Sequence, residues 1–219
     1  ATDDRRISDA VTAAGGEAVM TSPEHRSGSD RIAEVAEKLP EGSIIVNVQG
    51  DEPVISPAVI DAAVHSLLNS PEADIATTSE KIADVDDLFD PNIVKVVTDI
   101  NGNALYFSRS PMPFPREAAM RHEGNAKKAA KAEPQILSLY KKHTGLYVYR
   151  REFLLRFTKM PQTPLEQTEM LEQLRALENG AKIKVIETTS RSIGVDTERD
   201  LELVRAILEA EEEAHELVD

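Results

Sequence analysis

The stretch "IIVNVQGDEP", from Ile44 to Pro53, limits the possible fold more than any other part of the sequence. Its β-branched aliphatic start predicts a strand buried on both faces, because such short apolar runs are typical of inner strands in α/β sheets. Gly50 allows a sharp turn after this run, and the proline prevents the strand from continuing. Asp51 and Glu52 are therefore expected at the carboxyl end of an inner strand, where open α/β sheets bind ligands.

Predicted helices and strands alternate through the first third of the chain. From hydrophobic spacing and glycine or proline stops we expect a helix over 4–16, a strand over 17–21, a loop and helix over 27–39, a strand over 44–48, a helix over 57–68 and a strand over 73–79. This rhythm is typical of α/β proteins with a doubly wound, mostly parallel sheet. We expect a single such domain over residues 1–219.

A hairpin interrupts this rhythm. The segment "NIVKVVTDINGNALYFSR" (92–109) predicts two strands joined at Asn101-Gly102, because both central positions of this turn favour left-handed backbone conformations. Residues 111–134 contain prolines, alanines and lysines with weak periodicity, so we predict a long mobile loop there.

The last third carries well-marked helix boundaries. Thr163, Pro164 and Glu166 form a capping-box pattern that predicts one helix over 163–180. The other expected elements are a strand then a helix over 143–157, a strand over 182–188, and a final helix capped by Thr197 with Asp200 as its third residue.

Composition excludes several classes of function. The 219 residues carry a formal net charge of −14, which argues against nucleic acid polymers and anionic membranes as partners. The sequence has no cysteine, so disulfides and thiolate metal sites are excluded. We recognise no signal peptide and no apolar stretch long enough to span a membrane, and expect a soluble, cytoplasmic protein.

A set of ordered motifs resembles one known family. The motifs are "SGSDR", "NVQGDEP", "PNIVKVV", "ALYFSRS.MP", "KKHTGLYVYRREFL", "PLEQTEMLEQLR" and "GVDTERDLE". Together they resemble 3-deoxy-manno-octulosonate cytidylyltransferase, the CMP-Kdo synthetase of Gram-negative bacteria, from Ala1 to about Leu208. The resemblance implies a Rossmann-like nucleotidyltransferase with an inserted hairpin lobe at about 92–157 that forms a homodimer. It also implies transfer of CMP from CTP to the anomeric hydroxyl of 3-deoxy-manno-octulosonate (Kdo), with release of pyrophosphate, for lipopolysaccharide synthesis.

The resemblance also implies a metal site and a catalytic arginine. Asp51 and Asp196 match the family's Mg²⁺ ligands, and Mg²⁺ is a hard cation that carboxylate and phosphate oxygens coordinate. Without the resemblance, Asp196 would equally be explained by the charge preference of a helix start. Arg109 matches a family arginine beside the sugar, where a guanidinium can bind a carboxylate through two hydrogen bonds.

The remaining site residues are carried over from the family motifs. His143, Gln49 and Gln173 match sugar-binding positions, although a histidine at a strand start is as often structural. Glu166 matches a sugar contact, yet its capping-box position already explains it. Ser27, Gly28 and Arg31 match a loop beside the nucleotide, and an ordinary helix N-terminus is the plainer reading.

One departure from the family leads to a further expectation. Family members begin with a strand and a basic loop that wraps the triphosphate, and this sequence starts beyond both. We therefore expect a fragment, with no strand on one side of residues 44–48, that does not fold alone as a soluble CTP-binding monomer. Two alternatives stay open: a sister cytidylyltransferase for another acidic sugar, such as a sialic acid or an amino-substituted Kdo, and an inactive fragment that retains sugar binding or dimerisation.

Overall fold

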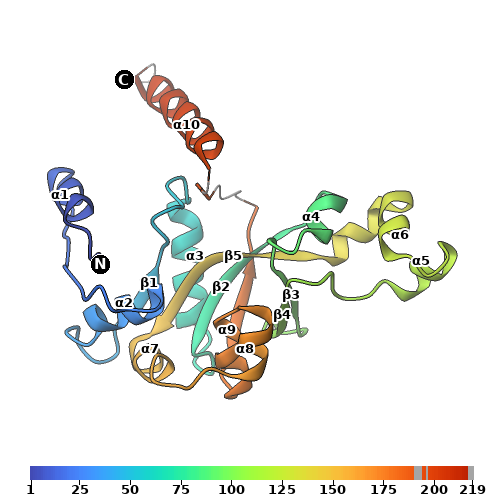
Figure 1. Cartoon of the computed structure of the whole chain (residues 1–219), viewed down its shortest axis with the longest axis horizontal. Helices are drawn as coiled ribbons and strands as arrows, with labels where there is room; N and C mark the ends of the chain where they lie inside the picture. Colours follow the sequence, from blue (N-terminus) through green and yellow to red (C-terminus); the bar gives the residue numbers. More distant parts are fainter. Residues whose placement is uncertain (190–193, 196, 217–219) are drawn as a thin grey trace.

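The computed structural model describes residues 1–189, 194–195 and 197–216, with side chains described up to residue 210. In chain order its elements are α1 (Arg5–Ala13), α2 (Gly28–Ala36), β1 (Ile44–Asn47), α3 (Pro57–Leu68), β2 (Ile75–Lys81), α4 (Val85–Phe89), β3 (Lys95–Thr98), β4 (Ala104–Ser108), α5 (Arg116–Arg121), α6 (Ala126–Ala132), the 3-10 helix η1 (Pro134–Leu139), β5 (Lys141–Arg150), α7 (Arg151–Phe157), α8 (Pro164–Glu169), α9 (Gln173–Glu178), β6 (Ile183–Glu187) and α10 (Glu198–Glu216). Figure 1 shows one curved sheet with helices on both of its faces, and a smaller helical arm at one end.

The sheet is organised around the long strand β5. The strands follow the order β4-β3-β5-β2-β6, and β1 pairs with the carboxyl-terminal half of β5. The prediction of an α/β fold with an inserted hairpin is confirmed, but the expected predominance of parallel pairs is wrong for the described strands. Only β2 and β6 run parallel there, because β5 borders β1, β2 and β3 and runs antiparallel to all three.

One edge of β1 has no partner strand within the described ranges. Its four residues pair with Tyr147 to Arg150 of β5 on the other edge. This agrees with the expected lack of a strand on one side of residues 44–48. The expectation of a fully buried inner strand is met only in part, since Ile45 is 9% exposed and Val48 is 40% exposed.

Alternating side chains of the strands bury two separate apolar layers. Ile45, Ile75 and Tyr149 face a core built with α2, α7 and α9. The neighbouring positions Ala76 and Val148 face the other way, where they pack with α3. Since successive strand residues point to opposite faces of the sheet, a strand buried on both faces needs apolar residues at odd and at even positions. This explains the continuous aliphatic runs in the sequence.

Two of the predicted elements differ in the structure. The single helix expected over 163–180 is broken into α8 and α9, because Met170 adopts a left-handed backbone conformation with φ of 53°. The capping box at Thr163 and Glu166 is confirmed. The strand expected over 17–21 is reduced to one isolated parallel bridge between Thr2 and Met20.

The segment expected to be a mobile loop forms most of an arm, which we define as residues 111–140. It contains α5, α6 and η1, so the prediction of a long loop over 111–134 is wrong. Asn125 caps α6 by accepting a hydrogen bond from the Lys128 N–H, and Ala129 and Ala130 are fully buried. Helices of one or two turns are too short to show a clear hydrophobic period, which is why the pattern was weak.

The two local signals read from turn and cap residues are confirmed. β3 and β4 form the expected hairpin, and Gly102 adopts φ of 79° in its turn. At the start of α10 the Thr197 hydroxyl accepts a hydrogen bond from the Asp200 N–H, and the Asp200 carboxylate accepts one from the Thr197 N–H.

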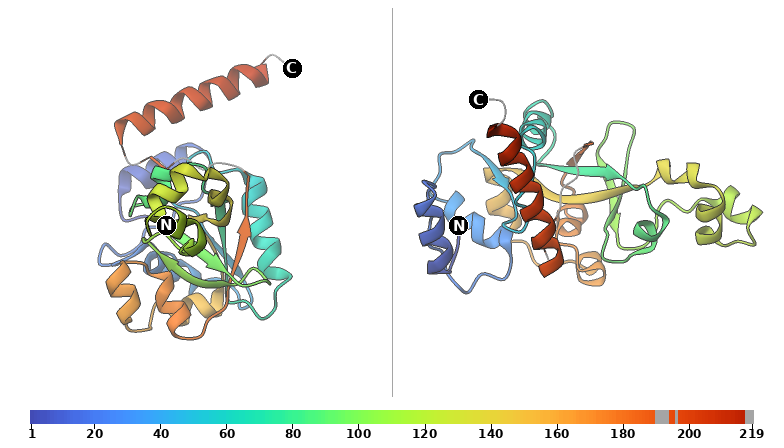
Figure 2. Two further views of the ribbon diagram at one scale, coloured as in Figure 1. Left: turned by 90° about the vertical axis from the view of Figure 1, so that its right-hand side faces the viewer. Right: turned by 90° about the horizontal axis from the view of Figure 1, so that it is seen from above.

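Figure 2 shows α10 outside the layers formed by the sheet and the other helices. Among the described helices, none has the length and apolar composition needed to cross a lipid bilayer.

Candidate active site

The loop after β1 brings two distant segments together. The carbonyl of Asp51 accepts a hydrogen bond of 2.8 Å from the N–H of Val195, so residues 194–195 lie beside this loop. Asp196 itself lies outside the described residues. The side chain of Asp51 is exposed, and the amide of Gln49 donates to the Asn47 side chain at 3.1 Å. The carboxyl edge of β1 therefore presents an exposed carboxylate close to Val195.

Glu52 lies deeper than Asp51. Burial raises the pKa of the Glu52 carboxyl, and the negative charges of Asp51 and Glu80 raise it further. Its Oε1 atom approaches Gly145 of β5, where an added Cβ would lie 3.9 Å away. The positive charge of Lys142 acts in the opposite direction on the pKa of Glu52.

His143 and Tyr147 of β5 form the middle of the site. The hydroxyl of Thr77 donates a hydrogen bond to the Leu146 carbonyl at 2.7 Å, so its oxygen accepts a hydrogen bond from the N–H at His143 Nε2, 2.8 Å away. The ring of His143 lies edge-on to Phe107 at 5.1 Å and next to Tyr147 at 5.2 Å. Burial among these groups lowers the pKa of His143 to about 4. The imidazole is therefore neutral at pH 7, and its Nδ1 is left as a hydrogen-bond acceptor.

Glu172 connects the start of α2 with the turn between α8 and α9. The hydroxyls of Ser27 and Ser29 donate to its carboxylate at 3.2 and 2.8 Å. Burial raises the pKa of the Glu172 carboxyl, while these hydrogen bonds oppose the rise. The pKa of Tyr147 is raised by burial and then by the charges of Tyr149 and Glu172. Sequence reasoning missed Glu172, and the only available signal was its place in the "EMLEQLR" motif.

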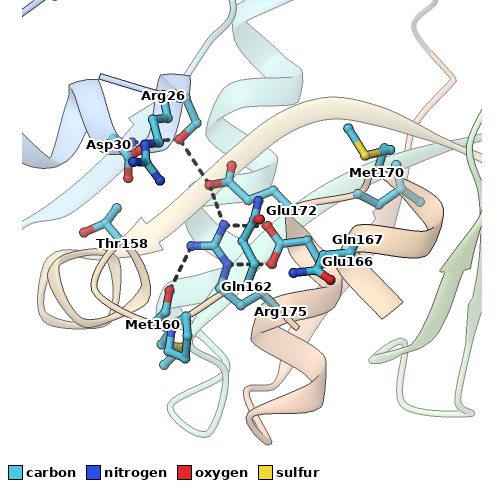
Figure 3. A pocket seen from close by; sticks show the side chains of 13 residues that line it. Arg26, Asp30, Thr158, Met160, Gln162, Glu166, Gln167, Met170, Glu172 and Arg175 are labelled. Carbon is cyan, nitrogen blue, oxygen red and sulfur yellow. Dashed lines mark hydrogen bonds and ion pairs between the residues drawn. The ribbon is translucent and has the colours of Figure 1, made fainter. Parts of the chain in front are cut away.

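A pocket of about 590 Å³ lies between α2 and the α8–α9 pair, within the range of small-molecule sites. Figure 3 shows Arg175 at its base, with its guanidinium between Glu166 and Glu172. Arg175 donates to both Glu166 oxygens, at 2.8 and 2.5 Å, and both side chains are buried. Burial acts to raise the pKa of Glu166, but the hydrogen bonds from Arg175 and the Thr163 N–H outweigh it, so this pKa is lowered. Glu166 is thus a charged, internally paired carboxylate.

A second pocket of about 400 Å³ contains His143. Its wall is formed by β5, by the acids Glu52 and Glu80, by residues 92–94 before β3, and by Gly194. Lys142 contributes a positive charge and forms an ion pair of 3.1 Å with Glu80. This pocket joins the acidic edge at Asp51 to the histidine predicted to contact the sugar.

Several of the predicted site residues meet at the start of α2. Gly28 lies against the amide of Gln49, since a Cβ there would be 3.8 Å from Gln49 Oε1. Ser27 binds Glu172, and Gln173 is buried at the start of α9 beside it. Gln49, Ser27, Gly28 and Gln173 therefore lie near one another around the start of α2 and Glu172, whereas His143 lines the separate pocket beside residues 92–94.

Arg109 and Arg31 are placed differently from the expectation. The Arg109 guanidinium donates to the backbone carbonyls of Glu169 and Pro91 at 2.8 and 2.9 Å, and it lines neither pocket. Arg31 donates to the Thr21 hydroxyl at 2.7 Å and forms an ion pair of 3.1 Å with Asp3. Both guanidinium groups therefore hold neighbouring chain segments, because a rigid fork of donors satisfies several oxygens at once.

The residues at the β1 edge fit the chemistry of a Mg²⁺ site. Among the described residues no group of three or more potential ligands is assembled. Mg²⁺ nevertheless needs only one or two carboxylates when substrate phosphates and water complete its shell. Asp51 supplies a hard oxygen donor at the edge that Val195 reaches, and Glu52 follows it directly in the chain.

Comparisons with known proteins agree with this arrangement. Residues 1–183 match the model of the cytidylyltransferase family. The 3-deoxy-manno-octulosonate cytidylyltransferase of Trichlorobacter lovleyi is 53% identical over 201 residues, covering 92% of this chain and 77% of that protein. The enzyme of the same name from Geobacter sulfurreducens is 53% identical over 204 residues, covering 93% and 79%.

A solved structure supports the same relationship. The CMP:2-keto-3-deoxy-manno-octonic acid synthetase complexed with CTP superposes with a TM-score of 0.81 at 39% identity. The match covers 96% of this chain and 79% of that chain. The chain therefore belongs to the cytidylyltransferase family, among the 3-deoxy-manno-octulosonate cytidylyltransferases.

Proposed function

We propose that this protein transfers CMP from CTP to Kdo in the cytoplasm, and so activates the sugar for lipopolysaccharide synthesis. The observation that carries the proposal is the identity of about half the residues with enzymes of that name over nearly the whole chain. Two pockets support it, one lined by Ser27 and Glu172 and the other by His143, because they offer neutral and charged hydrogen-bonding groups suited to a polyhydroxylated substrate.

The reaction is a nucleotidyl transfer. The anomeric hydroxyl oxygen of the sugar bonds to the α-phosphorus of CTP, and the bond from that phosphorus to the bridging oxygen of the β-phosphate breaks. Pyrophosphate leaves with the bonding electrons, and the hydroxyl proton passes to solvent. Such transfers depend mainly on positioning and on stabilising negative charge.

The residues of this chain would bind and orient the two substrates. Neutral His143 offers Nδ1 as an acceptor for a sugar hydroxyl, with Nε2 held by Thr77. Gln49 and Gln173 are proposed as further sugar contacts, and Ser27 and Gly28 as contacts of the nucleotide. Arg109, Arg31 and Glu166 have no direct substrate contact in this proposal, because hydrogen bonds within the protein account for their charged groups.

Asp51 and Asp196 are the residues proposed to hold Mg²⁺. The cation would stabilise the negative charge that develops on the pyrophosphate. Support comes from the exposed carboxylate of Asp51 and from the hydrogen bond that brings Val195 to it.

The function is tested by measuring pyrophosphate release from CTP with a panel of acidic sugars. We expect turnover with Kdo to exceed turnover with sialic acid or amino-substituted Kdo, and CTP to be preferred over UTP and ATP. Greater turnover with another sugar would favour the sister-cytidylyltransferase alternative. Binding of Kdo without pyrophosphate release from any sugar would favour an inactive, sugar-binding protein.

We also propose that the protein forms a homodimer through the arm. Phe114, Met120 and Leu139 of the arm are 62%, 69% and 59% exposed, and they are large apolar side chains that an interface would cover. We expect sedimentation equilibrium to give twice the mass of one chain, and Met120→Glu to lower it toward one chain. Leu68→Glu, at an exposed apolar position on α3, is the matched control and should leave the mass unchanged. A single-chain mass for the unaltered protein would reject the dimer.

A further inference from the structure

The turn between α4 and β3 is held by two basic side chains. We call residues 90–93 the 90–93 loop. The Lys95 ammonium donates to the carbonyl of Asp90 at 2.8 Å and to the carbonyl of Ile93 at 2.6 Å. The Arg109 guanidinium donates to the carbonyl of Pro91 at 2.9 Å. Three of the four carbonyls in this loop are therefore bound by cations from the neighbouring strands.

These two cations are placed by the hairpin itself. Lys95 begins β3 and pairs in register with Ser108, the last residue of β4, and Arg109 follows directly. Glu169 completes the arrangement, since its carboxylate accepts hydrogen bonds from the Ser108 hydroxyl at 2.6 Å and the Arg109 N–H at 2.9 Å. The two strands, the loop and the end of α8 are thus joined by charged hydrogen bonds.

The burial of Lys95 is unusual. Its side chain is 0% exposed, whereas lysines are almost never fully buried unless their charge is satisfied. Burial lowers the pKa of Lys95, and the nearby positive charge of Arg109 lowers it too, while Asp90 and Glu169 act in the opposite direction. An aliphatic residue would be less costly to bury at this position of the strand than a charged one. The hydrogen bonds to the 90–93 loop therefore explain why a lysine is present.

The 90–93 loop forms part of the pocket that contains His143. Asn92, Ile93 and Val94 line this pocket. Val94 directly follows the loop, and its carbonyl accepts a hydrogen bond of 2.8 Å from the backbone N–H of His143. Displacing the loop would therefore move both the pocket wall and the backbone that carries His143.

We propose that Lys95, assisted by Arg109, is a positioning residue that holds the 90–93 loop as a preformed wall of the pocket for the acidic sugar. This inference rests on the proposed function, because it takes the pocket at His143 as the sugar site. Lys95 touches no substrate in this proposal. It acts through the loop backbone, and its effect falls on sugar binding more than on nucleotide binding.

The test compares Michaelis constants for the two substrates in Lys95 variants. Lys95→Met keeps the length and apolar stem but removes the three donors. We expect it to raise KM for Kdo about tenfold or more and to leave KM for CTP within about twofold, as is usual when positioning of one substrate is lost. Lys95→Arg retains donors for the carbonyls and should recover most of the sugar affinity. Lys159→Met, at a side chain 72% exposed, is the control and should match the unaltered protein.

Hydrogen–deuterium exchange gives a readout that does not depend on the variants folding. In the unaltered protein, Kdo should slow exchange of the amides of residues 92–94, and CTP alone should not. If Kdo leaves these amides unchanged, or if a folded Lys95→Met protein keeps its KM for Kdo, the inference is wrong. If the unaltered protein transfers CMP to no acidic sugar, the proposed function itself fails, which is a separate result.

Discussion

Asp51→Asn is expected to lower the turnover number for CMP transfer roughly a thousandfold or more, because a neutral amide no longer offsets charge on the departing pyrophosphate. Asp51 is exposed at the edge of β1 and is not needed for a buried contact, so its replacement should leave the melting temperature unchanged. Initial rates of pyrophosphate release at saturating CTP and Kdo, together with thermal melts, measure both effects.

The matched comparisons for this variant are Asp196→Asn and Asp61→Asn. If Asp51 and Asp196 hold one cation, each single variant and the double variant should lose similar activity, because residues acting as a unit are not additive. Asp61 is an exposed acid of α3 and should tolerate the same change. A rate close to that of the unaltered enzyme in Asp51→Asn would remove this residue from the metal site.

Glu166→Gln is expected to lower the free energy of unfolding by about 3–5 kcal/mol, because it removes the nearest counter-charge of the buried Arg175 and leaves only Glu172, 3.6 Å away. The side chains of Arg175 and Glu166 are only 9% and 6% exposed, and both carboxylate oxygens are used. The same variant also weakens the capping box at Thr163. Urea unfolding followed by circular dichroism measures the change.

Glu117→Gln is the control for this experiment. Glu117 also pairs with an arginine, Arg121 at 2.8 Å, but its side chain is 94% exposed, so its replacement should leave the free energy of unfolding nearly unchanged. The result also decides between two roles for Glu166. Unchanged stability with a raised KM for Kdo would show that Glu166 contacts the sugar, as its family motif suggested, and not that it holds α8 to α9.

Local signals in the sequence predicted the elements that depend on neighbouring residues. Pro57–Leu68 forms α3 as expected, and the Asn101-Gly102 turn forms the β3–β4 hairpin. The failures are at positions where distant contacts decide the backbone. The break at Met170 is one of them, since it allows Glu172 to meet serines about 145 residues earlier in the chain.

The candidate site divides in the same way. A strand followed by glycine and two acids was sufficient to predict that Asp51 and Glu52 lie at a sheet edge. The hydrogen-bond partners of each charged side chain were not predictable from the sequence. The guanidinium of Arg109, for example, could bind a substrate carboxylate or backbone carbonyls equally well. The structure shows that its donors go to Pro91 and Glu169.

The sequence by itself therefore determined the family, the α/β class and the local boundaries marked by caps and turns, because these depend on residue types at short spacing. The tertiary structure alone decided the strand directions around β5, the shared carboxylate of Glu172 and the burial of Lys95 against its loop. Each of these joins segments that are distant in sequence or places a charge in an apolar setting. Their energies depend on desolvation and on which partner is within reach, and only the packed chain defines both.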